Sequence, residues 1–204
     1  MRVDVVEIGE PEIPACAGVL AQAFDEDPLQ LYVLPDPATR QSVSPKQLEA
    51  SVRYGVLYGL GLRTGGDCRG VAVWLRPGAT EIDAARAVAA GMGAAAHAMG
   101  PEATERSQRI WRLFAETRAR EAGPRYWHLL VIGVLPAHQG LGLGSALMTP
   151  VLSLADLDGV PCFVETVQPR NQPLYERHGF RLVRDQIDRE SGLRLFSFLR
   201  PPRA

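Results

Sequence analysis

The sequence has few cysteines, and they are scattered along the chain. Cys16, Cys68 and Cys162 form no C-x-x-C pair and have no spacing typical of a zinc cluster. These facts exclude a disulfide-stapled secreted module and a zinc-ribbon protein. We expect the three thiols to act as small buried hydrophobic side chains in a reducing compartment.

The sequence also lacks an excess of charge of either sign and a long apolar run. It has 22 basic and 23 acidic residues, so no global field would draw it onto nucleic acid or a membrane. No window approaches the roughly 18 apolar residues of a membrane-spanning helix, and the first apolar stretch contains Asp4 and Glu7, unlike a signal peptide. We therefore expect a soluble cytoplasmic protein whose residues 1–204 form a single domain.

A strand, a glycine-rich turn and a helix follow one another between residues 126 and 157. Residues 129–135 form a nearly continuous apolar run, as in a strand buried on both faces, and Pro136 should end it. The turn contains Gln139, Gly140, Gly142 and Gly144, and a helical pattern starts at Ser145. Because the first N–H groups of a helix lack internal partners and the helix dipole favours negative charge there, this turn predicts a phosphate or pyrophosphate site.

Two common phosphate-binding motifs do not fit this turn. A Walker A loop needs Lys and then Ser or Thr after its last glycine, but Gly144 is followed by Ser145 and Ala146. A dinucleotide fingerprint that starts at Gly140 would place Ser145 where its third glycine belongs. A nucleoside triphosphatase and a dinucleotide-binding enzyme are both disfavoured.

The turn instead has the pattern Q-x-x-G-x-G after a strand that ends in V-x-P. The residues of this pattern are Val134, Pro136, Gln139, Gly142 and Gly144. It resembles the acetyl-CoA signature of the GCN5-related N-acetyltransferase (GNAT) superfamily. A second string, N-x-x-x-Y-x-x-x-G-F at residues 171–180, is also similar to that superfamily. Together with F-x-x-D-P at Phe24, these strings look most like the puromycin N-acetyltransferase group.

The resemblance implies a GNAT fold of the α/β (α+β) class. This fold is a mixed, mostly antiparallel sheet of six to seven strands, flanked by helices, whose two central strands are parallel and splayed. The sequence pattern predicts strands at residues 3–8, 60–64, 70–75, 129–135, 161–167, 181–188 and 193–199, and helices at 15–24, 44–58, 81–99, 102–121 and 145–157. Asn171 should cap one more short helix, with Gly179 just past its end.

Two segments keep alternative interpretations. The helical insert at about residues 79–123 is either an acceptor lid, a dimer surface, or a set of helices packed on the sheet without contact to substrate. The F-x-x-D-P segment at Phe24 is either part of the acceptor wall, as in the family, or an acidic loop.

The resemblance also implies how acetyl-CoA binds, with no metal ion involved. The glycine turn would cradle the pyrophosphate, and the pantetheine arm would pair with strand backbone near residues 132–134, where the two central strands splay apart. The expected acetyl-CoA-binding residues are Ile132, Gly133, Val134, Gln139, Gly140, Leu141, Gly142, Leu143, Gly144, Ser145, Thr166, Asn171 and Tyr175.

Amine acylation needs a base that takes a proton from the ammonium group and an acid that protonates the departing thiolate. Tyr175 is the candidate acid, because the resemblance places its hydroxyl beside the sulfur; its alternative role is a packed core tyrosine. His128, whose imidazole would titrate near neutral pH, is one candidate base. Glu165 is the other, because burial should raise the pKa of a carboxyl group. Transfer through water without a protein base is the third route.

These features predict direct acetyl transfer from acetyl-CoA to a primary amine of a small molecule in a ternary complex. No cysteine lies in either motif, so no covalent enzyme intermediate is expected. An antibiotic, an aminonucleoside or another metabolite could be the acceptor, and antibiotic resistance would then be a role. We expect no nucleic-acid or membrane partner, and a monomer or a homodimer. The alternatives are a protein or peptide acetyltransferase acting on lysine or the N-terminus, and a non-catalytic acetyl-CoA-binding regulator.

Overall fold

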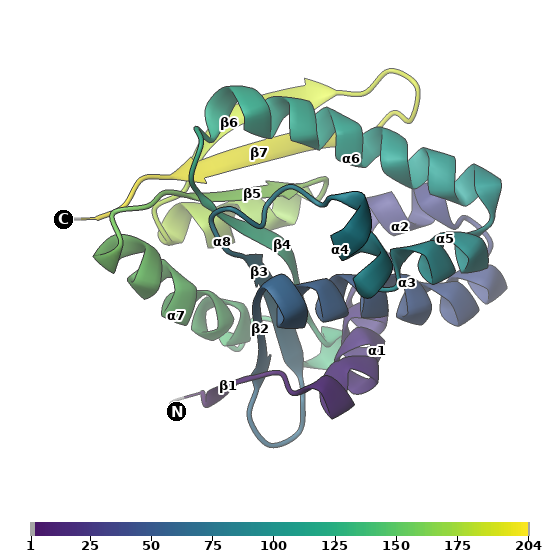
Figure 1. Cartoon of the computed structure of the whole chain (residues 1–204), viewed down its shortest axis with the longest axis horizontal. Coiled ribbons are helices and arrows are strands. Elements are labelled where there is room, and N and C mark those ends of the chain that lie inside the picture. The colour runs from purple at the N-terminus through teal and green to yellow at the C-terminus, as the bar shows by residue number, and fades with distance from the viewer. Residues whose placement is uncertain (1–2, 204) are drawn as a thin grey trace.

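The strands form one mixed sheet with helices on both faces (Figure 1). The computed structural model describes residues 3–203. Within these residues, seven strands lie in the order β1-β2-β3-β4-β5-β7-β6, and only β4 and β5 are parallel neighbours. The strands are β1 (Val5–Glu7), β2 (Gly59–Thr64), β3 (Gly70–Leu75), β4 (Trp127–Val134), β5 (Cys162–Thr166), β6 (Arg181–Ile187) and β7 (Arg194–Arg200). The predicted mixed sheet with a parallel central pair is confirmed.

The two parallel strands are paired only where they begin. The pairing with β5 covers residues 127–129 of β4, although β4 continues to Val134. The register between β4 and β3 shifts between Val73 and Trp74, which leaves Leu130 as the extra residue of a β-bulge. A bulge bends its strand, and the strands separate directly after it. The predicted splay is confirmed, and it begins earlier along β4 than the expected residues 132–134.

Two layers of helices bury opposite faces of the sheet. Side chains alternate between the faces of a strand, so Val71 and Val73 of β3 pack in a core with α1 and α3, whereas Ala72 and Trp74 pack with α7. The helices are α1 (Ile13–Ala23), α2 (Pro28–Val33), α3 (Pro37–Tyr58), α4 (Ala84–Ala89), α5 (Met92–Met99), α6 (Pro101–Glu121), α7 (Leu143–Leu157) and α8 (Gln172–Arg177). None of the helices within residues 3–203 is long and apolar enough to cross a membrane.

The insert supplies α4, α5 and α6, and α6 lies across the β5-β7-β6 side of the sheet (Figure 1). Ile110 and Phe114 of α6 pack with Val167 and Leu195 from the end of the sheet. Ion pairs add to this packing: Arg109 contacts Asp188 at 2.6 Å. The insert is therefore joined to the sheet through the middle of α6.

Several local predictions need correction. α3 begins at Pro37 and not at residue 44, because the Asp36 carboxylate caps its first turn by accepting from the N–H of Thr39 at 2.7 Å. Asn171 stands at the start of α8, but its side chain makes no capping hydrogen bond and donates instead to Thr166 Oγ1 at 3.2 Å. The predicted position of Gly179 is confirmed by its left-handed backbone, with φ of +87°.

The thiols of Cys16 and Cys68 are neighbours in space, with 3.9 Å between their sulfur atoms. Cys16 lies on α1, and Cys68 lies in the loop before β3 and is only half-buried. The expectation that all three thiols are buried is therefore wrong for Cys68.

Candidate functional site

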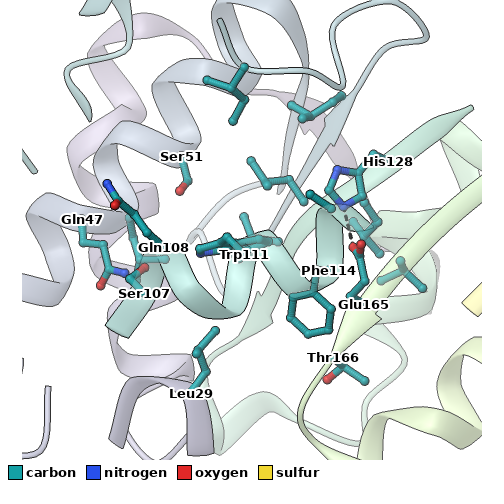
Figure 2. Close-up of a pocket in the computed structure, with 18 of the residues that line it drawn as sticks. Leu29, Gln47, Ser51, Ser107, Gln108, Trp111, Phe114, His128, Glu165 and Thr166 are labelled. Atoms are coloured by element: carbon teal, nitrogen blue, oxygen red, sulfur yellow. Dashed lines mark hydrogen bonds and ion pairs between the residues drawn. The ribbon is translucent and has the colours of Figure 1, made fainter. Parts of the chain in front are cut away.

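A cavity of about 730 Å³ opens where β4 and β5 separate. Its lining combines residues from β4 and β5 with residues from α3, α5 and α6 (Figure 2). Phe24 and Asp27 of the F-x-x-D-P segment also line it. Of the residues predicted for the site, those in the lining are His128, Ile132, Glu165, Thr166, Asn171 and Tyr175. The helices of the insert thus form one wall of this cavity.

His128 and Glu165, the two candidate bases, are in direct contact. His128 Nε2 lies 2.7 Å from Glu165 Oε2 (Figure 2). The other carboxylate oxygen accepts a hydrogen bond from Arg118 of α6 at 2.5 Å. The side chains of His128 and Glu165 are each 2% exposed, and that of Arg118 is 12% exposed. The three residues therefore form one buried unit that joins both parallel strands to the insert.

Burial and neighbouring charge set the protonation of this unit. Burial lowers the pKa of His128 below its ordinary value, with a further contribution from Arg118, and this outweighs the opposing effect of Glu165. Burial alone would raise the pKa of Glu165, but His128 and Arg118 together hold it below its ordinary value. The predicted raised pKa of Glu165 is therefore wrong. At neutral pH the unit holds a neutral imidazole and an ionised carboxylate.

The ionised carboxylate also fixes which imidazole nitrogen carries the proton. A carboxylate only accepts hydrogen bonds, so Nε2 of His128 must be the protonated nitrogen and Nδ1 keeps its lone pair. Nδ1 is buried and has no hydrogen-bond partner among residues 3–203. A buried polar atom without a partner costs about 1–3 kcal/mol. A proton donor in the cavity, such as an ammonium group, would remove that cost, and a base oriented by a carboxylate is a recurrent catalytic arrangement.

Tyr175 both packs in the core and lines the cavity. Its ring contacts Phe180 and Phe198, with centroid distances of 5.9 and 5.4 Å. Burial raises the pKa of its hydroxyl, and the carboxylates of Asp27 and Glu165 raise it further. The phenol is therefore protonated at neutral pH, which suits a proton donor. The two interpretations of Tyr175 are compatible, because one side chain can do both.

The glycine turn lies beyond the cavity, at the start of α7. Gly140 and Gly142 have φ of +78° and +81°, a conformation that glycine adopts without steric cost. The first helical hydrogen bond runs from the N–H of Ala146 to the carbonyl of Gly142, and no acceptor within residues 3–203 faces the N–H groups of residues 140–145. The side-chain amide of Gln139 donates to the Val134 carbonyl at 3.1 Å and ties the turn to β4. Clustered free amides at a helix start fit a phosphate group.

Comparison with known proteins agrees with this geometry. Residues 103–182, which contain α6, β4, the glycine turn and Tyr175, match the family model of the acetyltransferase (GNAT) domain. This segment is therefore similar to a GNAT acetyltransferase domain. An uncharacterized N-acetyltransferase of Schizosaccharomyces pombe is 26% identical to it over 170 residues, which cover 80% of this chain and 68% of that protein.

Solved structures show the same GNAT fold. A Corynebacterium glutamicum protein described as histone acetyltransferase HPA2 and related acetyltransferase has a TM-score of 0.69 at 22% identity, covering 100% of this chain and 98% of the other. Arylalkylamine N-acetyltransferase 2 of Aedes aegypti has a TM-score of 0.64 at 15% identity, with both chains fully covered (100% and 100%). At these identities the similarity shows the fold alone and does not identify the acceptor.

Sequence reasoning missed several residues of this site. Arg118 was not singled out, although it holds Glu165, because an arginine in an arginine-rich helix carries no signal of its partner. Trp111 and Phe114 of the same helix line the cavity too. Trp111 and Phe114 lie about two turns and one turn before Arg118, so the sequence indicates that the three share one face of the helix. It does not indicate which part of the sheet that face covers.

Proposed function

We propose that this GNAT domain transfers an acetyl group from acetyl-CoA to the primary amine of a small molecule. The observation that carries the proposal is that a neutral His128, held by an ionised Glu165, and a protonated Tyr175 line one cavity at the point where β4 and β5 separate. Acetyl-CoA supplies an activated acetyl thioester, and amine acylation needs one base and one acid. The cavity contains one of each.

Separate groups of residues bind the cosubstrate and transfer the protons. The free amides of residues 140–145 would bind the pyrophosphate of the cosubstrate, and the unpaired part of β4 beyond Leu129 would hold the pantetheine arm. His128 Nδ1 takes a proton from the acceptor ammonium, so that the amine lone pair can attack. The hydroxyl of Tyr175 gives a proton to the thiolate that departs as the C–S bond breaks, and the second proton that the nitrogen loses as the amide forms restores the tyrosine. No residue becomes acetylated, and no step calls for a metal ion.

The rest of the lining indicates the kind of acceptor. Aromatic and aliphatic side chains dominate the wall away from the strands, and they include Leu29, Met92, Met99, Trp111 and Phe114. The lining also holds the carboxylates of Asp27, Glu81 and Glu165 against the guanidinium groups of Arg112 and Arg118, so carboxylates are in excess by one, which favours a cation. An amine with an apolar or aromatic body fits both features. The same fold in an arylalkylamine N-acetyltransferase is consistent with such an acceptor.

A peptide acceptor is the second candidate. The C. glutamicum protein with the same fold is described as a histone acetyltransferase. Here, however, α5 and α6 of the insert contribute to the cavity wall, which suits a small molecule better than an extended peptide. A non-catalytic acetyl-CoA sensor would have no use for the His128 and Glu165 pair or for Tyr175. The likeness to the puromycin N-acetyltransferase group adds aminonucleosides, and hence antibiotic resistance, as a narrower proposal.

The test is thiol release from acetyl-CoA across a panel of amines. The panel contains arylalkylamines, diamines, aminonucleosides and lysine-containing peptides, and mass spectrometry identifies each acetylated product. We expect thiol release that depends on a small primary amine and continues in the presence of a metal chelator. Release only with peptides, or none with any amine, contradicts the proposal.

A further inference from the structure

The cavity extends well beyond its catalytic end. Ser107, Trp111, Phe114 and Arg118 of α6 all line it, and Arg118 marks the catalytic end through its contact with Glu165. Ser107 lies eleven residues before Arg118 on the same helix, which is about 16 Å along the helix axis at 1.5 Å per residue. An acceptor that filled the cavity would therefore be a long molecule.

A group of uncharged polar side chains lies at the end away from His128. We call it the distal group; its members are Gln47 and Ser51 of α3 and Ser107 and Gln108 of α6. Figure 2 shows these four on the opposite side of Trp111 from His128 and Glu165. The α3 members are four residues apart, so they share a helix face.

The distal group has hydrogen-bonding capacity that the protein does not use. Gln47 Oε1 is buried and has no hydrogen-bond partner within the described chain. Ser107 is 7% exposed, and its hydroxyl likewise makes no hydrogen bond to any of residues 3–203. Buried polar groups are nearly always paired in folded proteins. A ligand that brings both a donor and an acceptor to this end of the cavity would pair them.

We propose that the distal group is a subsite for a neutral group that both donates and accepts hydrogen bonds, such as a carboxamide, at the far end of the acceptor amine. The proposal rests on the proposed function, because it deepens the specificity of the same cavity. The acceptor then has a primary amine near His128, an apolar middle against Trp111 and the neutral polar group near Gln47. A methyl group in that place leaves Gln47 Oε1 without a donor, and so does a carboxylate, which only accepts hydrogen bonds.

The test uses three amines with the same arylalkyl body and length that end in a carboxamide, a methyl group or a carboxylate. We expect kcat/KM to favour the carboxamide over each of the others about tenfold, which corresponds to about 1.4 kcal/mol. Gln47→Leu keeps the approximate side-chain volume but removes the acceptor oxygen. It should bring the preference within about twofold by lowering kcat/KM for the carboxamide-ended amine. Gln41→Leu, at an exposed position of α3 outside the cavity, is the matched control.

Calorimetric binding of the same three amines separates this proposal from the proposed function. Tighter binding of the carboxamide that is lost in Gln47→Leu and kept in Gln41→Leu supports the subsite. If the same proteins release no thiol from acetyl-CoA, the acetyl-transfer proposal fails and the subsite stands. Equal binding of the three amines, binding of none of them, or a preference that survives in Gln47→Leu overturns the subsite. Thermal melting of both variants shows that the fold is kept.

Discussion

His128 Nε2 lies 2.7 Å from Glu165 Oε2, across the parallel strands β4 and β5. Since Arg118 binds the other oxygen of Glu165, the carboxylate is shared between a neutral ring and a cation. Groups that act as a unit give strongly non-additive effects when they are removed separately.

A double-mutant cycle on this pair should therefore be non-additive. We expect Glu165→Gln and His128→Ala each to lower kcat by about 10²–10⁴-fold, the range of general acid–base catalysis. The double variant should be no slower than the slower single variant, since Glu165 acts through His128. Steady-state kinetics on all four proteins checks this. Losses that multiply would show that the two residues act independently.

Tyr175→Phe removes the proposed acid and keeps the ring that packs against Phe180 and Phe198. We expect kcat to fall about 10²-fold or more, with an unchanged melting temperature and nearly unchanged binding of acetyl-CoA. Tyr58→Phe, on α3 and outside the cavity, is the control. Full turnover in Tyr175→Phe would show that Tyr175 is not the acid.

Two glycines of the turn should differ in their tolerance of a methyl group. Gly142 has φ of +81°, so alanine there costs about 1–2 kcal/mol or reshapes the turn, and we expect acetyl-CoA to bind about tenfold more weakly to Gly142→Ala. Gly144 lies inside α7, and an added Cβ would meet only Leu174 Cδ2 at an ordinary 3.5 Å. Gly144→Ala should keep its affinity within about threefold. Calorimetry with acetyl-CoA measures both variants, and equal affinities would exclude the turn as the pyrophosphate site.

Asp188 should stabilise the attachment of the insert. Burial alone would raise its pKa, but hydrogen bonds from Ser191 and Arg109 lower it to about 2 from an ordinary 3.8. A depressed carboxyl pKa stabilises the fold above the ordinary value, and this contribution is lost as the pH falls from 3.8 towards 2. Asp188→Asn should therefore lose about 2 kcal/mol at neutral pH, since one pKa unit is about 1.4 kcal/mol, and almost nothing near pH 2. Denaturant titrations at both pH values measure the free energy of unfolding of this variant, with Asp158→Asn at an exposed position as the control.

Local features of this chain could be predicted from its sequence. The glycine turn, the strand before it and the helix after it follow from residues that are adjacent in the chain, and the structure has them within two residues of the predicted bounds. The short helix α8 ends just before Gly179 for the same reason. The mixed sheet followed from the family resemblance, because no periodicity shows that two strands are parallel or that they separate.

Contacts across the fold could not be predicted in the same way. The sequence offers His128 and Glu165 as alternative bases, and only the strand register shows that the two side chains are in contact. The predicted pKa of Glu165 had the wrong direction because His128, and with it Arg118 of the insert, contacts the carboxylate. Gly133 shows a third limit. A Cβ added at Gly133 would lie 2.9 Å from Ala23 Cβ and from Leu20 Cδ2. Close packing of α1 therefore requires glycine there, independently of any contact between its backbone and the cosubstrate.

The central claim is that neutral His128, held by Glu165 and Arg118, is the base, and the pH dependence of kcat tests it most directly. Catalysis needs the unprotonated ring, so activity should fall as the pH drops through a pKa below the ordinary 6.5. Glu165 raises that pKa and Arg118 lowers it. With one amine and acetyl-CoA saturating, the acid limb of the profile should move to lower pH in Glu165→Gln and to higher pH in Arg118→Met. An acid limb at the same pH in the native protein and both variants would contradict the account.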